Sequence, residues 1–186
     1  MEPTRRRGAA LEADLLDAAW AELQAVGYTH LTMEGVALRA RTGKQVLYRR
    51  WNNRAELIVA ALRHRRGSLI DQVPDTGTLR GDVLALMRFT LERQREIGQD
   101  VFRGLLAEVA DMDPHFSEAM RNVLTTLLTR AAERGEIPTA DLPQRVISLP
   151  VDLLRYDMLV GLEGVTERDL VAIVDDVFLP LVLRSV

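Results

Sequence analysis

Apolar residues recur at three- and four-residue spacing along almost the whole chain. In the first clear segment, this spacing puts Leu11, Leu15, Ala19 and Leu23 on one stripe of a helix. The alternation at period two that is typical of a half-buried β-strand is absent. Aromatic residues, which favour strands, make up only 5% of the chain. The sequence therefore predicts an all-α fold of about nine helices and no sheet.

Glycine, proline and capping residues predict where these helices begin and end. Gly27 is positioned to end the first helix in a left-handed conformation, and Thr32 and Asn53 are good N-caps for later helices. Pro150 falls inside a helical segment and predicts a kink there. The expected helices cover about residues 8–26, 33–39, 44–50, 54–66, 79–97, 100–110, 114–134, 143–159 and 166–184.

The chain divides after residue 67 into two parts of opposite charge, and a turn-rich segment follows at residues 73–77. Residues 1–67 contain twelve Lys or Arg and seven Asp or Glu, a formal charge of +5, whereas residues 68–186 carry −8. We therefore expect two domains with these bounds. A basic end on an acidic body is typical of a protein that meets a polyanion at that end, although an excess of five charges also arises by scatter.

The basic part contains a short helix, a three-residue turn and a second short helix, which is the helix-turn-helix arrangement. Val46 and Leu47 are spaced to pack the second short helix inward. Lys44, Gln45 and Tyr48 would lie on its outer side, together with Arg49 and Arg50. An exposed helix with cationic, amide and phenolic tips suits the major groove, because it offers donors to phosphates and base edges.

The chain resembles the TetR family of transcriptional regulators over its whole length. The resemblance is most specific over residues 9–64. The motifs that carry the resemblance are Gly27-Tyr28, the Thr32 cap, the run from Lys44 to Trp51, and Arg54-x-Glu56-Leu57. The resemblance implies a DNA-binding domain at residues 1–67, with Trp51 in its core. It implies a helical domain for ligand binding and dimerisation at residues 68–186.

The turn before the recognition helix departs from the family pattern. The family usually has Gly-Val-Ser there, and this chain has Arg41-Thr42-Gly43. Arg41 therefore stands where the backbone angle φ is expected to be positive, and Gly43 replaces a serine that caps the helix and touches a phosphate. Either the turn is changed, or Arg41 adds a phosphate contact of its own.

The resemblance implies DNA contacts for the polar residues of this segment. Tyr48 would present its hydroxyl to a phosphate, Lys44 would reach a phosphate or a guanine edge, and Gln45 would contact a base or a phosphate. Thr32 would both cap its helix and touch a phosphate, and Arg54 would bind a phosphate. Each has a plainer interpretation, as a packing aromatic, a solvated side chain or a cap alone. The predicted DNA-binding residues are Thr32, Arg41, Lys44, Gln45, Tyr48, Arg49 and Arg54.

The long helices after residue 78 resemble the family's regulatory domain. The helices at 143–159 and 166–184 would form a homodimer, and a small-molecule effector would bind among the helices at 79–97, 100–110, 114–134 and 143–159. The function implied is a repressor that the effector releases from a pseudo-palindromic, double-stranded operator. The predicted ligand-binding residues, each of a kind that is more often plain core than pocket, are Met87, Leu91, Phe102, Leu106, Met120, Leu124 and Tyr156.

Other classes of function find little support in the sequence. The three histidines have no metal-ligand spacing, and no nucleophile elbow or phosphate-binding glycine loop occurs. We therefore expect no enzyme activity, no cofactor and no metal. No apolar run is long enough to cross a membrane, which fits a cytoplasmic protein. The remaining alternative is a helical ligand-binding or scaffold protein whose helix-turn-helix no longer binds DNA.

Overall fold

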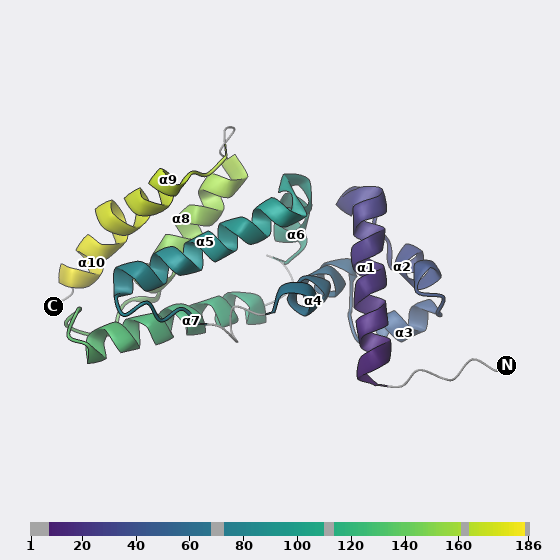
Figure 1. Cartoon of the computed structure of the whole chain (residues 1–186), viewed down its shortest axis with the longest axis horizontal. Helices are drawn as coiled ribbons and strands as arrows, with labels where there is room; N and C mark the ends of the chain where they lie inside the picture. The colour runs from purple at the N-terminus through teal and green to yellow at the C-terminus, as the bar shows by residue number, and fades with distance from the viewer. Residues whose placement is uncertain (1–7, 68–72, 110–113, 161–163, 185–186) are drawn as a thin grey trace. The chain divides into compact units, whose positions relative to one another are not determined.

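The computed structural model of the chain describes residues 8–67, 73–109, 114–160 and 164–184. These residues form helices throughout and contain no strand, which confirms the predicted fold class (Figure 1). Three helical segments follow one another without a break over residues 167–184 and form one last helix, so nine helical stretches are described. None of the described helices is both long and apolar enough to cross a membrane. The helices are α1 (Ala9–His30), α2 (Met33–Arg39), α3 (Lys44–Tyr48), α4 (Arg54–Arg66), α5 (Leu79–Ile97), α6 (Gln99–Val109), α7 (Pro114–Glu133), α8 (Gln144–Val160), α9 (Glu167–Ala172), the π-helical segment η2 (Ile173–Phe178) and α10 (Leu179–Arg184).

The chain forms two compact units. Unit 1 comprises residues 1–68 and 103–112, and unit 2 comprises residues 69–102 and 113–186. One boundary between the units lies near residue 68. The later part of α6, however, clusters with unit 1, whereas the sequence pattern assigned all of α6 to the second domain.

Unit 1 packs α2 and α4 against α1, and α3 against α2 (Figure 1). The stripe predicted on α1 faces inward, because Leu15, Ala19 and Leu23 are buried. Leu57 and Ile58 of α4 are fully buried as well. The three-to-four spacing of apolar residues is thus what holds the unit together, through removal of these side chains from water.

The ends of these helices follow the capping signals. Gly27 has φ 71° and interrupts α1, so the predicted end of the first helix lies at this residue and a short helical turn continues to His30. The Thr32 side chain accepts a hydrogen bond from the Gly35 amide at 3.0 Å, and the Asn53 side chain accepts one from the Glu56 amide at 2.9 Å. Each cap satisfies an amide that the first helical turn leaves without a partner.

Unit 2 is built around α5, which packs on α7, α8 and the last helix (Figure 1). Three arginines of α5 bind partners near the C-terminal end of the chain. Arg80 pairs with Asp175 at 2.7 Å, Arg88 pairs with Glu167, and Arg95 donates to the Val165 carbonyl at 3.0 Å. Pro150 lies inside α8, as its position in the sequence predicted, and its side chain is buried.

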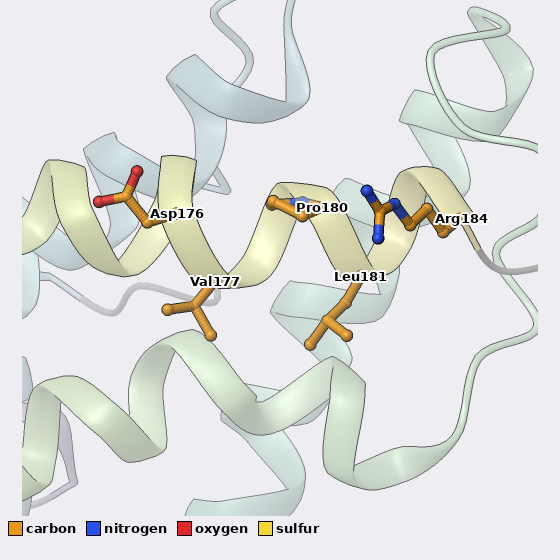
Figure 2. A pocket seen from close by; sticks show the side chains of 5 residues that line it. All are labelled: Asp176, Val177, Pro180, Leu181 and Arg184. Atoms are coloured by element: carbon orange, nitrogen blue, oxygen red, sulfur yellow. The ribbon is translucent and has the colours of Figure 1, made fainter.

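The last helix carries a wide apolar stripe that divides between the core and the surface. Leu170, Val174 and Phe178 are fully buried, whereas Val177 and Leu181 are exposed. These two residues lie one turn apart and point to the same side of the helix, where they line a shallow hollow with Asp176, Pro180 and Arg184 (Figure 2). The stripe therefore presents apolar surface beyond what the core of one chain uses.

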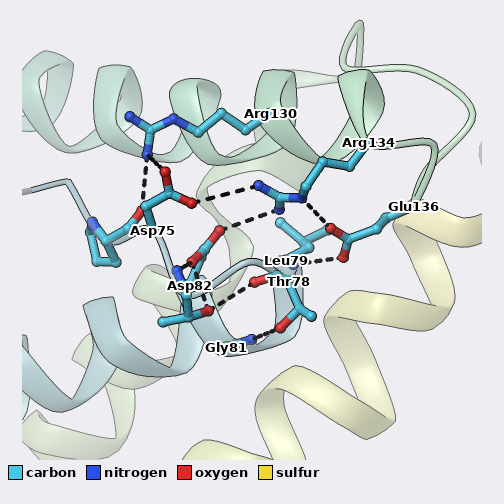
Figure 3. A network of polar contacts seen from close by, with 10 residues as sticks. Asp75, Thr78, Leu79, Gly81, Asp82, Arg130, Arg134 and Glu136 are labelled. Atoms are coloured by element: carbon cyan, nitrogen blue, oxygen red, sulfur yellow. Dashed lines mark hydrogen bonds and ion pairs between the residues drawn. The ribbon is translucent and has the colours of Figure 1, made fainter.

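A network of charged groups joins the start of α5 to the end of α7 (Figure 3). Asp82 is fully buried, and its carboxylate accepts hydrogen bonds from the Thr76 amide at 2.5 Å and from Arg134 at 3.4 Å. Glu136 accepts from the Leu79 amide at 2.7 Å and from Arg134 at 2.5 Å. A buried carboxylate is tolerated only when its oxygens are bonded in this way.

Replacement of Asp82 by Asn should therefore destabilise unit 2. The amide puts a donor where the network supplies donors, and we expect a loss of about 2–3 kcal/mol in the free energy of unfolding. Urea unfolding followed by helical circular dichroism measures this loss. Asp141→Asn, at an exposed aspartate of the same unit, is the control and should change stability by less than about 0.5 kcal/mol. Equal stability of the two variants would contradict the role given to Asp82.

Candidate DNA-binding surface

Helix α3 is short, and one side of it anchors it in unit 1. Leu47 is fully buried, and Trp51, three residues beyond the helix end, is buried as well. The Trp51 amide donates to the Leu47 carbonyl at 3.0 Å, which fixes the chain as it leaves the helix. The prediction that Trp51 belongs to the core is confirmed.

The opposite side of α3 carries polar side chains into solvent. Lys44, Gln45, Tyr48 and Arg49 are all exposed, and Tyr48 keeps 47% of its surface accessible although it is aromatic. Lys44 and Tyr48 stand one turn apart, as do Gln45 and Arg49, so the four form two adjacent rows on one face. The structure thus brings together the donors that the sequence assigned to this helix.

The start of α2 lies beside the start of α3. The Lys44 ammonium is 3.4 Å from the Glu34 carboxylate, and both side chains are about 60% exposed. An exposed pair of this kind contributes little to stability, so Lys44 can exchange Glu34 for another anion at small cost. Thr32, which caps α2, is exposed as well.

The turn between α2 and α3 contains Arg41 in the left-handed region, with φ 53°. The sequence predicted a positive φ at this position. Arg41 is exposed, and Gly43 occupies the N-cap of α3 without a side chain to cap it. Because Gly43 stands where the family usually has a capping serine, the start of α3 has no side-chain cap.

Arg54 does not join this face but lies in a polar cluster with Tyr28 and Glu108. Its guanidinium binds Glu108 at 2.5 Å and the backbone carbonyls of Tyr28 and Leu31 at 3.1 and 2.9 Å. Its charge also stands 4.7 Å from the Tyr28 ring centre. These donors are already engaged, so we replace the phosphate contact expected of Arg54 by a structural role: it ties the start of α4 to the end of α1.

The same cluster explains a residue that the sequence did not single out. Glu108 of α6 accepts a hydrogen bond from the Tyr28 hydroxyl at 3.0 Å in addition to those from Arg54. The hydrogen bonds from Arg54 lower the pKa of Glu108, against the opposing effect of burial. Burial, followed by the hydrogen bond to Glu108, raises the pKa of Tyr28 well above its usual range. Gly104 lies one turn earlier, where a Cβ would overlap the Tyr28 ring.

Comparison with known proteins agrees with this geometry over both units. Residues 15–61 match the family profile "Bacterial regulatory proteins, tetR family", and residues 73–177 match "Tetracyclin repressor-like, C-terminal domain". The chain belongs to the TetR family of transcriptional regulators. TetR-family regulators bind DNA through their helix-turn-helix, which here comprises α2 and α3.

Several relatives of this TetR-family chain match it over nearly its full length. The HTH-type transcriptional regulator Rv1556 of Mycobacterium tuberculosis H37Rv is 34% identical, with 94% of this chain and 89% of the relative covered. The "DNA-binding transcriptional repressor TetR" of Mycobacteroides abscessus is 32% identical, with 95% and 96% covered. The crystal structure of the TetR family regulator SCO0332 matches with a TM-score of 0.64 at 26% identity, covering 90% of this chain and 96% of that one.

The residues predicted to bind a ligand lie in different surroundings. Met87, Leu91 and Leu124 are buried in the core of unit 2, and Phe102 and Met120 are partly buried against it. Tyr156 is 61% exposed on α8, and the buried side of this helix carries other residues. Tyr156 therefore does not line an interior cavity in this structure. The side chain of Leu106 lies outside the described part of the chain.

The polar cluster predicts a pH-dependent contribution to the stability of unit 1. Glu108 has a lowered pKa, so its contribution is present above the pKa of an unfolded glutamate, about 4.3, and is lost as the pH falls through the folded value. We expect Glu108→Gln to lower the free energy of unfolding by about 1–2 kcal/mol at pH 7, and the difference from wild type to close only as the pH falls through the lowered pKa of folded Glu108. Both tryptophans, Trp20 and Trp51, lie in unit 1, so their fluorescence during urea unfolding reports on this unit.

Glu34→Gln is the matched control, because it removes a carboxylate from an exposed pair in the same unit. It should change stability by less than about 0.5 kcal/mol at both pH values. A Glu108→Gln protein that unfolds like wild type at pH 7 would show that the cluster does not stabilise the unit.

Proposed function

We propose that this chain is a repressor that binds a pseudo-palindromic operator as a homodimer and leaves it when a small molecule binds unit 2. The observation that carries the proposal is the exposed face of α3, where Lys44, Gln45, Tyr48 and Arg49 stand over the buried Leu47. The proposed DNA-binding residues are these four, with Thr32. The proposed place of action is the cytoplasm, where the operator DNA is.

Repression is proposed from one of the relatives that match the chain over nearly its full length. The M. abscessus protein, 32% identical, carries the description of a DNA-binding transcriptional repressor. A repressor needs only to occupy its operator. The helix-turn-helix and a second copy of the chain supply this, and no surface for recruiting polymerase is required.

A homodimer is proposed because one recognition helix reads only a few base pairs, too few for useful specificity in a genome. The exposed apolar residues near the C-terminal end of the chain suit a two-fold contact. Val177 and Leu181 form a row on the last helix (Figure 2), and Tyr156 and Val160 form a second row on α8, which packs beside it. Two such pairs of helices would bury these rows in a four-helix bundle.

The dimer predicts that a charge in this row will separate the protomers. Leu181→Glu would bury two carboxylates across a two-fold axis, and we expect a monomer by light scattering at micromolar concentration, where wild type is a dimer. Leu183→Glu is the control, because Leu183 is exposed on the same helix but off the row. A dimer that survives Leu181→Glu would place the interface elsewhere.

The ligand site is proposed inside unit 2, because a domain of more than one hundred residues is larger than dimerisation alone requires. The apolar residues of α5 and α7 that share one core there, Met87, Leu91 and Leu124, with Phe102 and Met120 packed against that core, suit an apolar ligand. The ligand must bind one arrangement of the two DNA-binding units better than the other. Helix α6 offers a route, since its first residues belong to unit 2 and its Glu108 holds the unit 1 cluster.

The DNA contacts predict how affinity depends on salt. Phosphate contacts release counterions, so Lys44→Ala should weaken binding to all sequences and lower the slope of log affinity against log salt by about 2 per dimer. Tyr48→Phe should remove a neutral hydrogen bond to a phosphate. The loss in binding free energy should be about 1 kcal/mol for each chain of the dimer, with little change in the salt slope. Gln45→Ala should relax the preference at one base pair of each half-site. Fluorescence titrations of operator and scrambled duplexes at several salt concentrations measure all three.

Arg63→Ala is the matched control, because it removes the same charge from an exposed site on α4. It should leave the salt slope nearly unchanged. If both Lys44→Ala and Tyr48→Phe bind operator as tightly as wild type, the proposed recognition face is wrong.

A further inference from the structure

Arg41 is the one residue other than glycine with a positive φ in the described part of the chain. It follows the C-cap of α2, and the turn closes through two hydrogen bonds. The Arg41 amide donates to the Leu38 carbonyl at 3.1 Å, and the Thr42 amide donates to the Ala37 carbonyl at 3.0 Å. This pair of bonds is the Schellman motif, in which glycine is the usual residue at the left-handed position.

The same chain uses the usual solution at the end of α7. There the Gly135 amide donates to Ala132 at 3.0 Å and the Glu136 amide donates to Ala131 at 2.9 Å, with φ 73° at Gly135. The two turns have the same hydrogen bonds, and only the residue at the left-handed position differs. The turn after α2 therefore needs a left-handed residue, and nothing in its hydrogen bonding needs an arginine.

An L side chain in this conformation is strained, because its Cβ lies too close to the following carbonyl oxygen. The Arg41 side chain does not offset this strain with an ion pair among the described residues. Its cationic neighbours do have carboxylate partners, since Arg39 binds Glu22 at 2.6 Å and Lys44 lies 3.4 Å from Glu34. Arg41 is instead an exposed cation two residues before the N-cap of α3.

We propose that Arg41 binds a DNA phosphate beside the recognition helix and that the strained turn is kept for this contact. The inference rests on the proposed function and adds a positioning contact to it. Gly43 leaves the start of α3 without a side chain that could contact the phosphate backbone. Arg41 comes two residues before Gly43, and two residues of chain span at most about 7 Å. A long guanidinium side chain at that point supplies the missing contact and binds phosphate in a bidentate manner.

Two substitutions separate the charge from the strain. Arg41→Gly removes both, whereas Arg41→Gln removes the charge and keeps an L side chain in the left-handed position. We expect both variants to lose on the order of tenfold in operator affinity, with the salt slope reduced by about 2 per dimer. Only Arg41→Gly should also raise the Tm of unit 1, by a few degrees, measured by tryptophan fluorescence.

The outcomes distinguish this inference from the proposed function. If Arg41→Gly and Arg41→Gln bind operator like wild type while Lys44→Ala binds more weakly, the Arg41 contact is overturned and the recognition face stands. If Arg41→Gln alone keeps wild-type affinity, the geometry of the turn matters and the charge does not, which also overturns the contact. If wild type itself fails to bind any operator duplex, the proposed function fails.

Discussion

Five residues cannot form a stable helix by themselves, because helix nucleation costs more than so few hydrogen bonds return. Helix α3, the part of the molecule that would enter the groove, spans only Lys44–Tyr48. Its conformation therefore depends on the burial of Leu47 and on the elements around it. The rest of unit 1 can be understood as support for this one helix: α2 packs on α3, and α1 packs on α2 and α4.

The Arg54 cluster extends this support to α6. Arg54 closes the end of α1 through two backbone carbonyls and binds Glu108, and Tyr28 donates to the same carboxylate. A single guanidinium thus joins three helices of unit 1 by charge-assisted hydrogen bonds, which are stronger than neutral ones. Loss of Glu108 would untie α6 from Arg54 of α4 and from Tyr28 of α1, and would leave Arg54 with the backbone carbonyls at the end of α1.

Local signals in the sequence predicted most of the fold. Gly27, Thr32 and Asn53 act on residues within one turn of themselves, so their effects can be read from a short stretch of sequence. The positive φ at Arg41 was different, because it could be predicted only from the resemblance, in which the family has glycine at this position. Long-range partners could not, because the pairing of Arg54 with a carboxylate 54 residues away depends on how α6 packs. Tyr156 shows the same limit, since apolar spacing alone does not say which side of α8 faces the core.

We propose that the exposed face of α3 binds DNA as one of two copies held by a dimer. Hydroxyl-radical footprinting of the DNA upstream of the chain's own gene tests it most directly. We expect two protected patches related by two-fold symmetry, about one helical turn (34 Å) apart. Protection should be lost from both patches together as protein concentration falls, because both belong to one dimer. A single protected patch, or folded protein that protects no part of this DNA, would contradict the claim.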